Sequence, residues 1–263
     1  MSDYTFNLPV GKFFLQINTK AERLHDRLVE WYQHVSNHSD QKLGSINIVV
    51  TDDDYSVNPI QSETNWDGNR CLFLASGCEG WIDLADPITL RLNSNTSLQS
   101  VEFFLRVVTA VRIFSLGGLL VHAAGIAREG QGYLFTGYSG AGKTTVCRLS
   151  DEFSVLNDDM VILSPTESGW QISATPFTNP TQVLPGSGTV KLHKILHLKQ
   201  ARQHELKQVS NAKAVAELLT HIPVISQSPQ HIPALMSRCV EITHTTEVQE
   251  LHFLPDKDFW KLL

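Results

Sequence analysis

The 263-residue chain has a formal net charge of −6, with 42% hydrophobic and 18% charged residues. This composition is typical of a soluble globular protein that is long enough for one large domain or two small ones. The acidic balance disfavours non-specific binding to nucleic acid or to an anionic membrane surface, because both need a basic face on the protein.

No targeting or membrane segment is visible in the sequence. The amino terminus lacks the basic and apolar regions of a secretory signal, and the longest apolar run, residues 107–124, is interrupted by Arg112, Gly117, Gly118 and His122. We therefore expect a cytoplasmic protein that binds neither nucleic acid nor membrane. The four cysteines contain no Cys-x-x-Cys pair, which predicts buried, reduced thiols.

The first hundred residues predict a small mixed α/β domain. Residues 12–18 form a short extended run, and Thr19 and Glu22 then have the spacing of a capping box. The apolar residues that follow recur at helical spacing: Leu24, Leu28, Trp31 and Val35. Four short apolar segments predict strands: residues 46–50, 71–75, 81–84 and 88–92. The polar stretch 51–70 is predicted to be a loop.

A long amphipathic helix is predicted between about residues 101 and 113, and the pattern changes after it. Residues 1–100 are assigned to the first domain and residues 101–263 to the second. In the second domain, apolar runs at 119–124, 132–136, 154–156 and 161–164 predict strands around a helix at 143–150, which is typical of an α/β core. Further strands are predicted at 190–198, 240–243 and 248–254, and a helix at 211–221, capped by Ser210. Residues 175–189, rich in proline and glycine, predict a long loop of functional importance.

The strongest motif begins at Gly137, where the chain matches Gly-x-x-x-x-Gly-Lys-[Ser/Thr] completely. Glycines allow the backbone to form a concave nest of N–H groups, the lysine supplies positive charge and the threonine hydroxyl can bind Mg²⁺. The motif follows an apolar strand and begins a helix, which is the context required for a phosphate-binding loop. The residues expected to bind the nucleotide are Gly137, Tyr138, Ser139, Gly140, Ala141, Gly142, Lys143, Thr144 and Thr145.

A pair of acidic residues, Asp158 and Asp159, lies about fifteen residues beyond this loop, between two apolar segments. Asn-Asp-Asp is also good turn chemistry. Beside a phosphate loop, however, one carboxylate can bind a metal ion and the other can accept a proton from an attacking hydroxyl. The expected metal ligands are Thr144, Asp158 and Asp159.

The segments around His122, the phosphate loop and the Asp158–Asp159 pair together resemble the catalytic domain of HPr kinase/phosphorylase. They are still more similar to HPr-kinase-related proteins, including those that phosphorylate precursor peptides. Phosphoenolpyruvate carboxykinases have a similar arrangement of histidine, phosphate loop and carboxylate pair. The resemblance covers about residues 118–163 and implies an α/β, overall α+β, P-loop kinase core of this type after the small first domain. It also implies that His122 lies beside the reacting phosphate.

The sequence therefore predicts an ATP-dependent phosphotransferase that transfers the γ-phosphoryl group to a hydroxyl, with serine of a peptide or small protein as the expected acceptor. ATP and Mg²⁺ are the expected cofactors. The catalytic residues are expected to be Asp159, Asp158, His122 and Lys143, with Asp159 as the base and the reverse assignment of the two carboxylates left open. Homo-oligomers are compatible with the sequence.

Two alternatives remain at this point. One is a small-molecule kinase or a carboxykinase-like enzyme, and the other is an interaction module that senses ATP without turnover. A GTPase is disfavoured because the chain lacks Asn-Lys-x-Asp.

Overall fold

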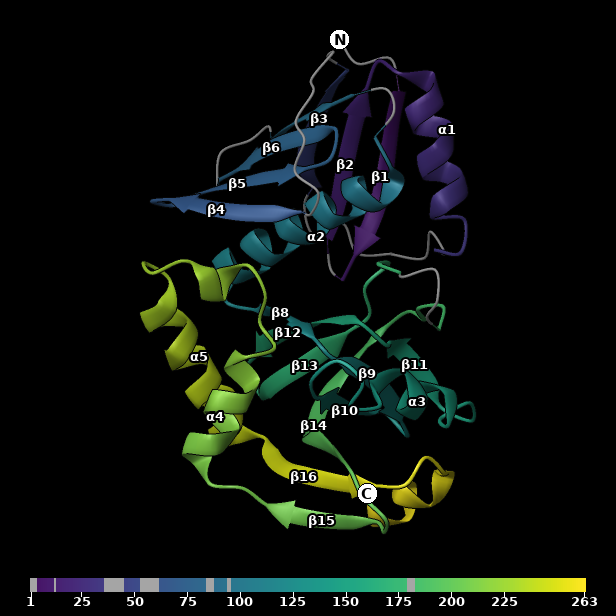
Figure 1. Cartoon of the computed structure of the whole chain (residues 1–263), viewed down its shortest axis with the longest axis vertical. Coiled ribbons are helices and arrows are strands. Elements are labelled where there is room, and N and C mark those ends of the chain that lie inside the picture. Colours follow the sequence, from purple (N-terminus) through teal and green to yellow (C-terminus); the bar gives the residue numbers. More distant parts are fainter. Residues whose placement is uncertain are drawn as a thin grey trace. The chain divides into compact units, whose positions relative to one another are not determined.

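The chain divides into two compact units, Met1–Ser115 and Leu116–Leu263, each with its own mixed sheet (Figure 1). The computed structural model describes residues 4–11, 13–35, 45–52, 62–83, 88–93, 96–178 and 183–263. With helices packed on two mixed sheets, the protein is a mixed α/β structure of the α+β kind. The division follows Ser115 rather than residue 100, because the helix Leu98–Ser115 packs on strands of the first sheet.

In the first unit, the described strands form a seven-stranded sheet in the order β1-β2-β3-β7-β6-β5-β4. The strands are β1 (Tyr4–Val10), β2 (Phe13–Thr19), β3 (Ser45–Asp52), β4 (Glu63–Asp67), β5 (Arg70–Ala75), β6 (Cys78–Ile82) and β7 (Ile88–Leu92). Burial alternates along β2, β5 and β7, as expected for a sheet with one face against a core. β3 pairs in parallel with β2 and β7, and the remaining pairs are antiparallel.

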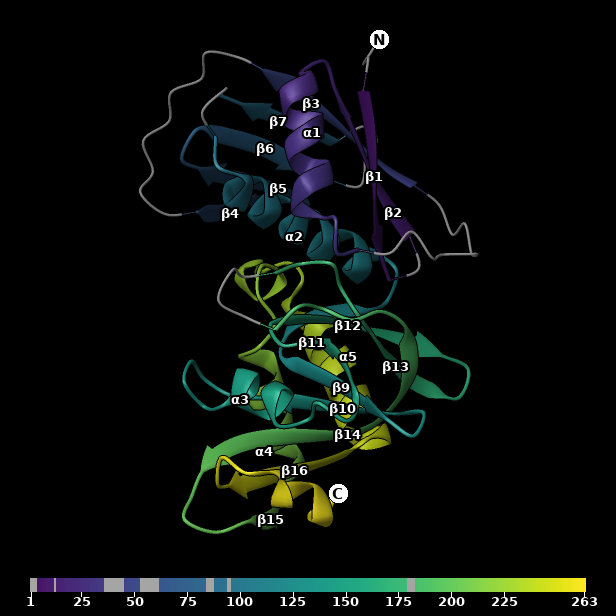
Figure 2. The ribbon, with the colours of Figure 1, turned by 90° about the vertical axis from the view of Figure 1, so that its right-hand side faces the viewer.

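Two helices accompany this sheet: α1 (Glu22–Trp31) lies beside β1 and β2, and α2 (Leu98–Ser115) beside β5 and β6 (Figures 1 and 2). Phe104 of α2 is fully buried, and its ring meets Phe73 edge-on with centroids 5.7 Å apart. A Cβ at Gly80 of β6 would lie 2.2 Å from Cε2 of Phe104. The close approach of α2 to the sheet therefore depends on glycine at this position.

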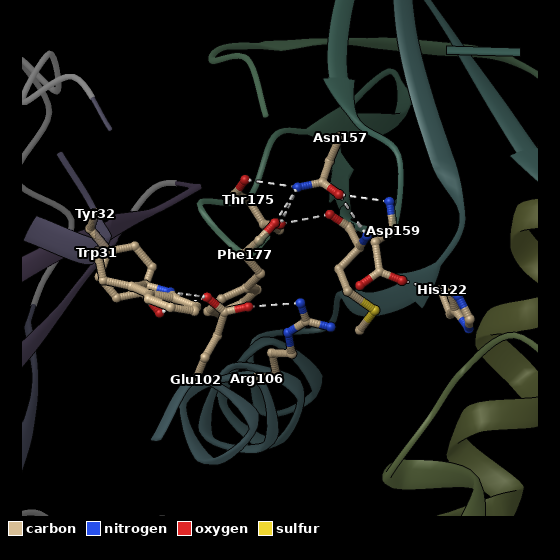
Figure 3. Close-up of polar contacts among 10 residues, drawn as sticks. Trp31, Tyr32, Glu102, Arg106, His122, Asn157, Asp159, Thr175 and Phe177 are labelled. Carbon is tan, nitrogen blue, oxygen red and sulfur yellow. Dashed lines mark hydrogen bonds and ion pairs between the residues drawn. The ribbon is translucent and has the colours of Figure 1, made fainter. Parts of the chain in front are cut away.

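The buried carboxylate of Glu102 joins the two helices (Figure 3). Its oxygens accept hydrogen bonds from Trp31 Nε1 at 2.8 Å and Tyr32 Oη at 3.2 Å, and Arg106 donates to it at 2.8 Å. Burial, followed by the charge of Glu102 nearby, raises the pKa of Tyr32 well above its usual value, so the phenol remains a hydrogen-bond donor. One buried carboxylate thus links the end of α1 to α2.

In the second unit, the described strands form a nine-stranded sheet in the order β11-β9-β10-β14-β13-β12-β8, and β16 pairs with both β14 and β15. The strands are β8 (Leu119–His122), β9 (Ala124–Arg128), β10 (Gln131–Thr136), β11 (Ser154–Asn157), β12 (Met160–Thr166), β13 (Gly169–Ser173), β14 (Thr189–Gln200), β15 (Glu205–Gln208) and β16 (Glu247–Phe253). The helices are α3 (Lys143–Arg148), α4 (Asn211–Leu219), α5 (Ile232–Thr245) and the short 3₁₀ helices η1 (Ile225–Gln227) and η2 (Lys257–Leu262).

An aromatic cluster lies under the phosphate-loop end of β10. Trp260 and Phe259 of η2 pack edge-on against Phe135, and Phe253 packs against Phe259. Trp260 also donates a hydrogen bond through Nε1 to the hydroxyl of Ser150, just beyond α3, at 2.8 Å. The carboxyl-terminal residues thus hold β10 and α3 in place from one side.

Several sequence-based assignments were wrong. Residues 240–243, predicted as a strand, lie within α5, whose apolar positions face the core at helical spacing. Where the predicted polar loop 51–70 is described, it contains the ends of β3 and β5 and all of β4, an edge strand whose side chains are partly exposed. Residues 53–61 of this prediction lie outside the described residues. The predicted capping box is absent, because Thr19 belongs to β2 and its hydroxyl accepts from the amide of Ala21, the residue that caps α1.

All four cysteines are buried and free, as predicted. Among the described residues, no helix has the length and apolarity needed to cross a membrane.

Substitution of Gly80 tests the contact between α2 and the first sheet. Gly80→Ala should destabilise the protein by about 1–3 kcal/mol, because the added methyl overlaps the ring of Phe104. Calorimetric melting should show the loss, and Gly80→Ala combined with Phe104→Leu should lose less than the sum of the two single variants. Additive losses would show that the two side chains do not compete for the same space.

Candidate functional site

The topology of the second sheet brings three separate segments to one edge. β9 pairs antiparallel with β10 on one side and with β11 on the other. β10 and β11 therefore run in the same direction, and both end at the same edge of the sheet. The phosphate loop follows β10, and Asp158 and Asp159 follow β11. β8 pairs antiparallel with β12 in a register that sets His122 opposite Met160, next to this edge.

The phosphate loop spans the residues between β10 and α3. Gly140 and Gly142 have φ angles of +80° and +114°, in the left-handed region that favours glycine. A Cβ at Gly142 would also lie 2.6 Å from Cζ of Phe253. The side chain of Gln200 donates a hydrogen bond to the carbonyl oxygen of Gly140 at 2.7 Å. The loop is thus fixed from the β14 and β16 side of the sheet, and the amino end of α3 opens from it.

Lys143 is buried, with 8% of its surface exposed, and its Nζ donates to the carbonyl oxygen of Gly137 at 2.8 Å. Burial lowers the pKa of Lys143, while the negative charges of Asp159 and Asp158 oppose the change. The buried ammonium group of Lys143 therefore lies near the negative charges of both carboxylates.

Asp158 is also buried, at 2% exposure. Its Oδ2 accepts a hydrogen bond from the amide of Val183 at 3.3 Å, and its carboxylate is hydrogen-bonded to the side chain of Thr144. Burial raises the pKa of Asp158, whereas the hydrogen bonds from Thr144 and Val183 lower it and the nearby charge of Asp159 raises it further. The first residue of the pair therefore faces the start of α3.

Asp159 faces the other way, toward β8. Its Oδ1 lies 3.1 Å from Nε2 of His122, whose side chain is 46% exposed (Figure 3). The backbone reinforces the contact, because the amide of Ala123 donates to the carbonyl oxygen of Asp159 at 3.0 Å. The two adjacent carboxylates consequently have different partners and different degrees of exposure.

These groups surround one open cavity of about 250 Å³. Its lining residues are His122, Ser139, Gly140, Gly142, Lys143, Thr144, Thr145, Asp158 and Asp159. Three of the residues predicted to bind nucleotide lie outside this lining. The carbonyl oxygen of Gly137 accepts a hydrogen bond from Lys143, Ala141 packs against the apolar core, and Tyr138 is 64% exposed.

Two buried histidines, His221 and His197, lie beneath the site and were not predicted from sequence. The carbonyl oxygen of His221, just beyond α4, accepts from the amide of His122 at 2.7 Å, and its ring lies 6.1 Å from that of Tyr138. His197 of β14 is hydrogen-bonded through Nδ1 to the hydroxyl of Thr136. Among the described residues, neither Nε2 of His221 nor Nε2 of His197 has a hydrogen-bond partner. Neither histidine belongs to a motif, so the sequence contained no signal for them.

No three histidine, cysteine, aspartate or glutamate side chains in the described ranges gather as ligands for a metal ion. A cation in this cavity would have to be bound by the Thr144 hydroxyl, by the carboxylates and by oxygens of a ligand. That is the donor set that Mg²⁺ uses in phosphate-binding sites.

Comparison with known proteins identifies the family. A model of the ScmC family, described as "SynChlorMet cassette protein ScmC", matches residues 89–231, which is more than half of the chain and includes the whole cavity lining. The chain belongs to this family. A search of curated proteins gives no match to the sequence.

Among solved structures, the chain has a slight likeness to the Hpr(Ser) kinase/phosphatase from Coxiella burnetii, with a TM-score of 0.26 and 11% sequence identity. The likeness covers 34% of this chain and 72% of the other. Similarity of this extent carries no argument about fold or activity.

The buried His221 makes stability depend on pH. Burial, followed by the positive charge of Lys143 and the neighbouring His197 and His122, lowers the pKa of His221 to about 4, although Glu217 opposes the change. Between about pH 4 and pH 6.5 the unfolded chain therefore binds a proton that the folded chain does not, so stability should fall as the pH falls through this window. The expected slope is at most about 1.4 kcal/mol per pH unit for this one group.

Urea unfolding across this pH range measures the effect. His221→Gln should have a smaller slope than the unsubstituted protein, and the exposed His193→Gln serves as the control. Burial lowers the pKa of His197 as well, so some slope should persist in His221→Gln. Identical slopes in the two variants would show that His221 is not held neutral by its surroundings.

Proposed function

We propose that this protein is an ATP-dependent kinase that transfers the γ-phosphoryl group to a hydroxyl, with serine of a peptide or small protein as the acceptor. The observation that carries the proposal is the convergence of the phosphate loop, the Asp158–Asp159 pair and His122 on one cavity. The resemblance of these three segments to HPr-kinase-related proteins supports the same chemistry.

Three features of the cavity support binding of the phosphates of a magnesium nucleotide. Left-handed glycines form the loop, Lys143 provides a buried positive charge, and α3 begins where the loop ends. ATP would supply the phosphoryl group, and Mg²⁺ would offset the negative charge of the ATP phosphates. Thr144 and Asp158 would hold the cation, because their side chains already meet and both line the cavity.

The different surroundings of the two carboxylates favour different roles. Asp158 is turned toward Thr144 and Val183, as suits a residue that binds the cation. Asp159 is turned toward the half-exposed His122, as suits a residue that receives the acceptor. This division agrees with the assignment of Asp159 as the base.

In the proposed reaction, the serine oxygen forms a bond to the γ-phosphorus while the bond from that phosphorus to the bridging oxygen of ADP breaks. The electron pair of the broken bond stays with ADP, and the hydroxyl proton passes to the carboxylate of Asp159. His122 orients this carboxylate through the 3.1 Å contact, and Lys143 offsets the negative charge that develops on the phosphates. Positioning and electrostatics of this kind are sufficient for phosphoryl transfer.

Nucleotide binding is the first test. Mg-ADP at a hundredfold excess over its dissociation constant should stabilise the native protein by about 2.7 kcal/mol and raise its melting temperature. Lys143→Ala should lose most of this gain, because it removes the buried charge of the loop. Lys257→Ala, at an exposed ion pair with Asp151, is the control. A wild-type protein whose melting is unchanged by Mg-ADP would contradict the proposal.

The carboxylate pair gives the sharper test, since it separates an enzyme from a module that only senses ATP. Asp159→Asn should retain Mg-ADP affinity but lose about 10²–10⁴ in the rate of phosphoryl transfer, the usual contribution of a positioned base. Asp158→Asn should weaken Mg-ADP binding itself. Radiolabel transfer from ATP to serine peptides measures the rate, and Asp151→Asn, at an exposed residue, is the matched control.

If the double variant Asp158→Asn/Asp159→Asn transfers phosphate as fast as the wild type, the pair is only a turn and the mechanism fails. If the wild type binds Mg-ATP but transfers phosphate to no peptide, protein or small hydroxyl compound, the sensing function is favoured instead.

A further inference from the structure

The side chain of Asn157, immediately before the carboxylate pair, is buried and satisfies every hydrogen-bonding group it has (Figure 3). Its Oδ1 accepts from the amides of Asp159 at 2.7 Å and Met160 at 2.9 Å. Its Nδ2 donates to the carbonyl oxygens of Thr175 at 3.1 Å and Phe177 at 2.9 Å, and lies 3.2 Å from the Thr175 hydroxyl. One carboxamide therefore connects the turn that bears the carboxylates to residues 174–178.

A second stretch of irregular backbone, residues 183–188, is attached to the same turn. The amide of Val183 donates to Oδ2 of Asp158 at 3.3 Å, and the amide of Gly186 donates to the carbonyl oxygen of Leu156 at 3.1 Å. A Cβ at Gly186 would lie 2.3 Å from the carbonyl oxygen of Val155, so glycine permits this close approach. Both described parts of the segment, 174–178 and 183–188, are thus attached within two residues of Asp158.

The segment also presents an apolar side chain to solvent. Leu184 exposes 67% of its surface, although it follows Val183, whose amide donates a hydrogen bond to Asp158. Phe177, at the other part, is buried and anchors the backbone. An exposed leucine on a segment fixed beside a catalytic carboxylate is well suited to contact an apolar residue of a peptide.

We propose that residues 174–178 and 183–188 form the surface that recognises the acceptor, and that Asn157 is the positioning residue that holds residues 174–178 of this surface against the carboxylate pair. The acceptor is then a peptide with an apolar side chain near its serine. This inference rests on the proposed kinase function and adds the substrate class to it.

The oxygen and the nitrogen of the Asn157 carboxamide make different contacts. A single substitution can remove the contacts of the nitrogen and keep those of the oxygen. Asn157→Asp keeps an oxygen that can accept from Asp159 and Met160, so the turn can persist. It replaces the Nδ2 donor by an oxygen that faces the carbonyl groups of Thr175 and Phe177, so the segment should detach. A residue needed only for the turn would tolerate this change better than a residue needed for the segment.

The test uses the full-length protein, Mg-ATP and a library of serine peptides with and without leucine beside the serine. In Asn157→Asp, the KM for the best peptide should rise about tenfold or more, as expected when hydrogen bonds that position a contact surface are lost. The KM for Mg-ATP should stay within about threefold. Hydrogen exchange should accelerate at the Ala174 amide, which donates to the carbonyl oxygen of Gly188 at 3.0 Å and lies in the part that Asn157 holds. Leu184→Ser changes an exposed residue and should raise the peptide KM in the same way without affecting folding. Leu116→Ser, at a leucine of similar exposure (69%) outside these residues, is the matched control and should behave as the wild type.

The outcomes distinguish this inference from the function on which it rests. Unchanged Ala174 exchange in Asn157→Asp would overturn the positioning role, whatever the activity. Faster exchange with an unchanged peptide KM, or an unchanged peptide KM in Leu184→Ser, would overturn the recognition role while leaving the kinase function intact. A wild type that binds Mg-ATP and phosphorylates no peptide would contradict the proposed acceptor class itself.

Discussion

The antiparallel pairing of β9 with both β10 and β11 is the constraint on which the candidate site depends. Since β10 and β11 are separated by one strand and run in the same direction, their carboxyl ends lie on either side of the first residues of β9. Gly125 of β9 also lets side chains of β12 and β13 approach this strand closely, because a Cβ there would lie 2.8 Å from Cγ1 of Val161 and 2.9 Å from Cδ1 of Ile172. The phosphate loop and the carboxylates, distant in sequence, then have little freedom to separate.

The charges gathered by this topology are tolerated because each has a partner. Lys143 donates a hydrogen bond to the carbonyl oxygen of Gly137 and lies near the charges of the carboxylates. Asp158 accepts hydrogen bonds from Thr144 and Val183. Unpaired buried charges would be costly, whereas paired ones fix the geometry of their neighbours. The buried His221 fits the same pattern, because burial beside Lys143 favours its neutral form and adds no further positive charge. The charged groups around the cavity are thus held in place by their partners.

The sequence located the residues that gather around this cavity better than it predicted the fold around them, for physical reasons. The phosphate loop, Asp158–Asp159 and His122 could be found because glycines, lysine and acidic pairs carry local signals, and all of them contribute to one cavity. The role of Asn157 could not be found, because it depends on contacts with Thr175 and Phe177 that the fold creates. Residues 240–243 were assigned to a strand because so short a run fits both the two-residue period of a strand and the 3.6-residue period of a helix. The packing of the whole α5 helix favours the helical period.

The contacts of Asp158 also bear on how the two sides of the site are coupled. Its carboxylate touches Thr144 on the phosphate side and Val183 on the segment side, so one side chain joins the part that would bind nucleotide to the part that would bind acceptor. In the proposed enzyme, a cation taken up by Asp158 and Thr144 would compete with the Val183 amide for the same oxygens. Nucleotide binding would then exchange one set of partners for another at this carboxylate. If this exchange changes the affinity for the acceptor, the acceptor changes the affinity for the nucleotide by the same factor, because thermodynamic coupling is reciprocal.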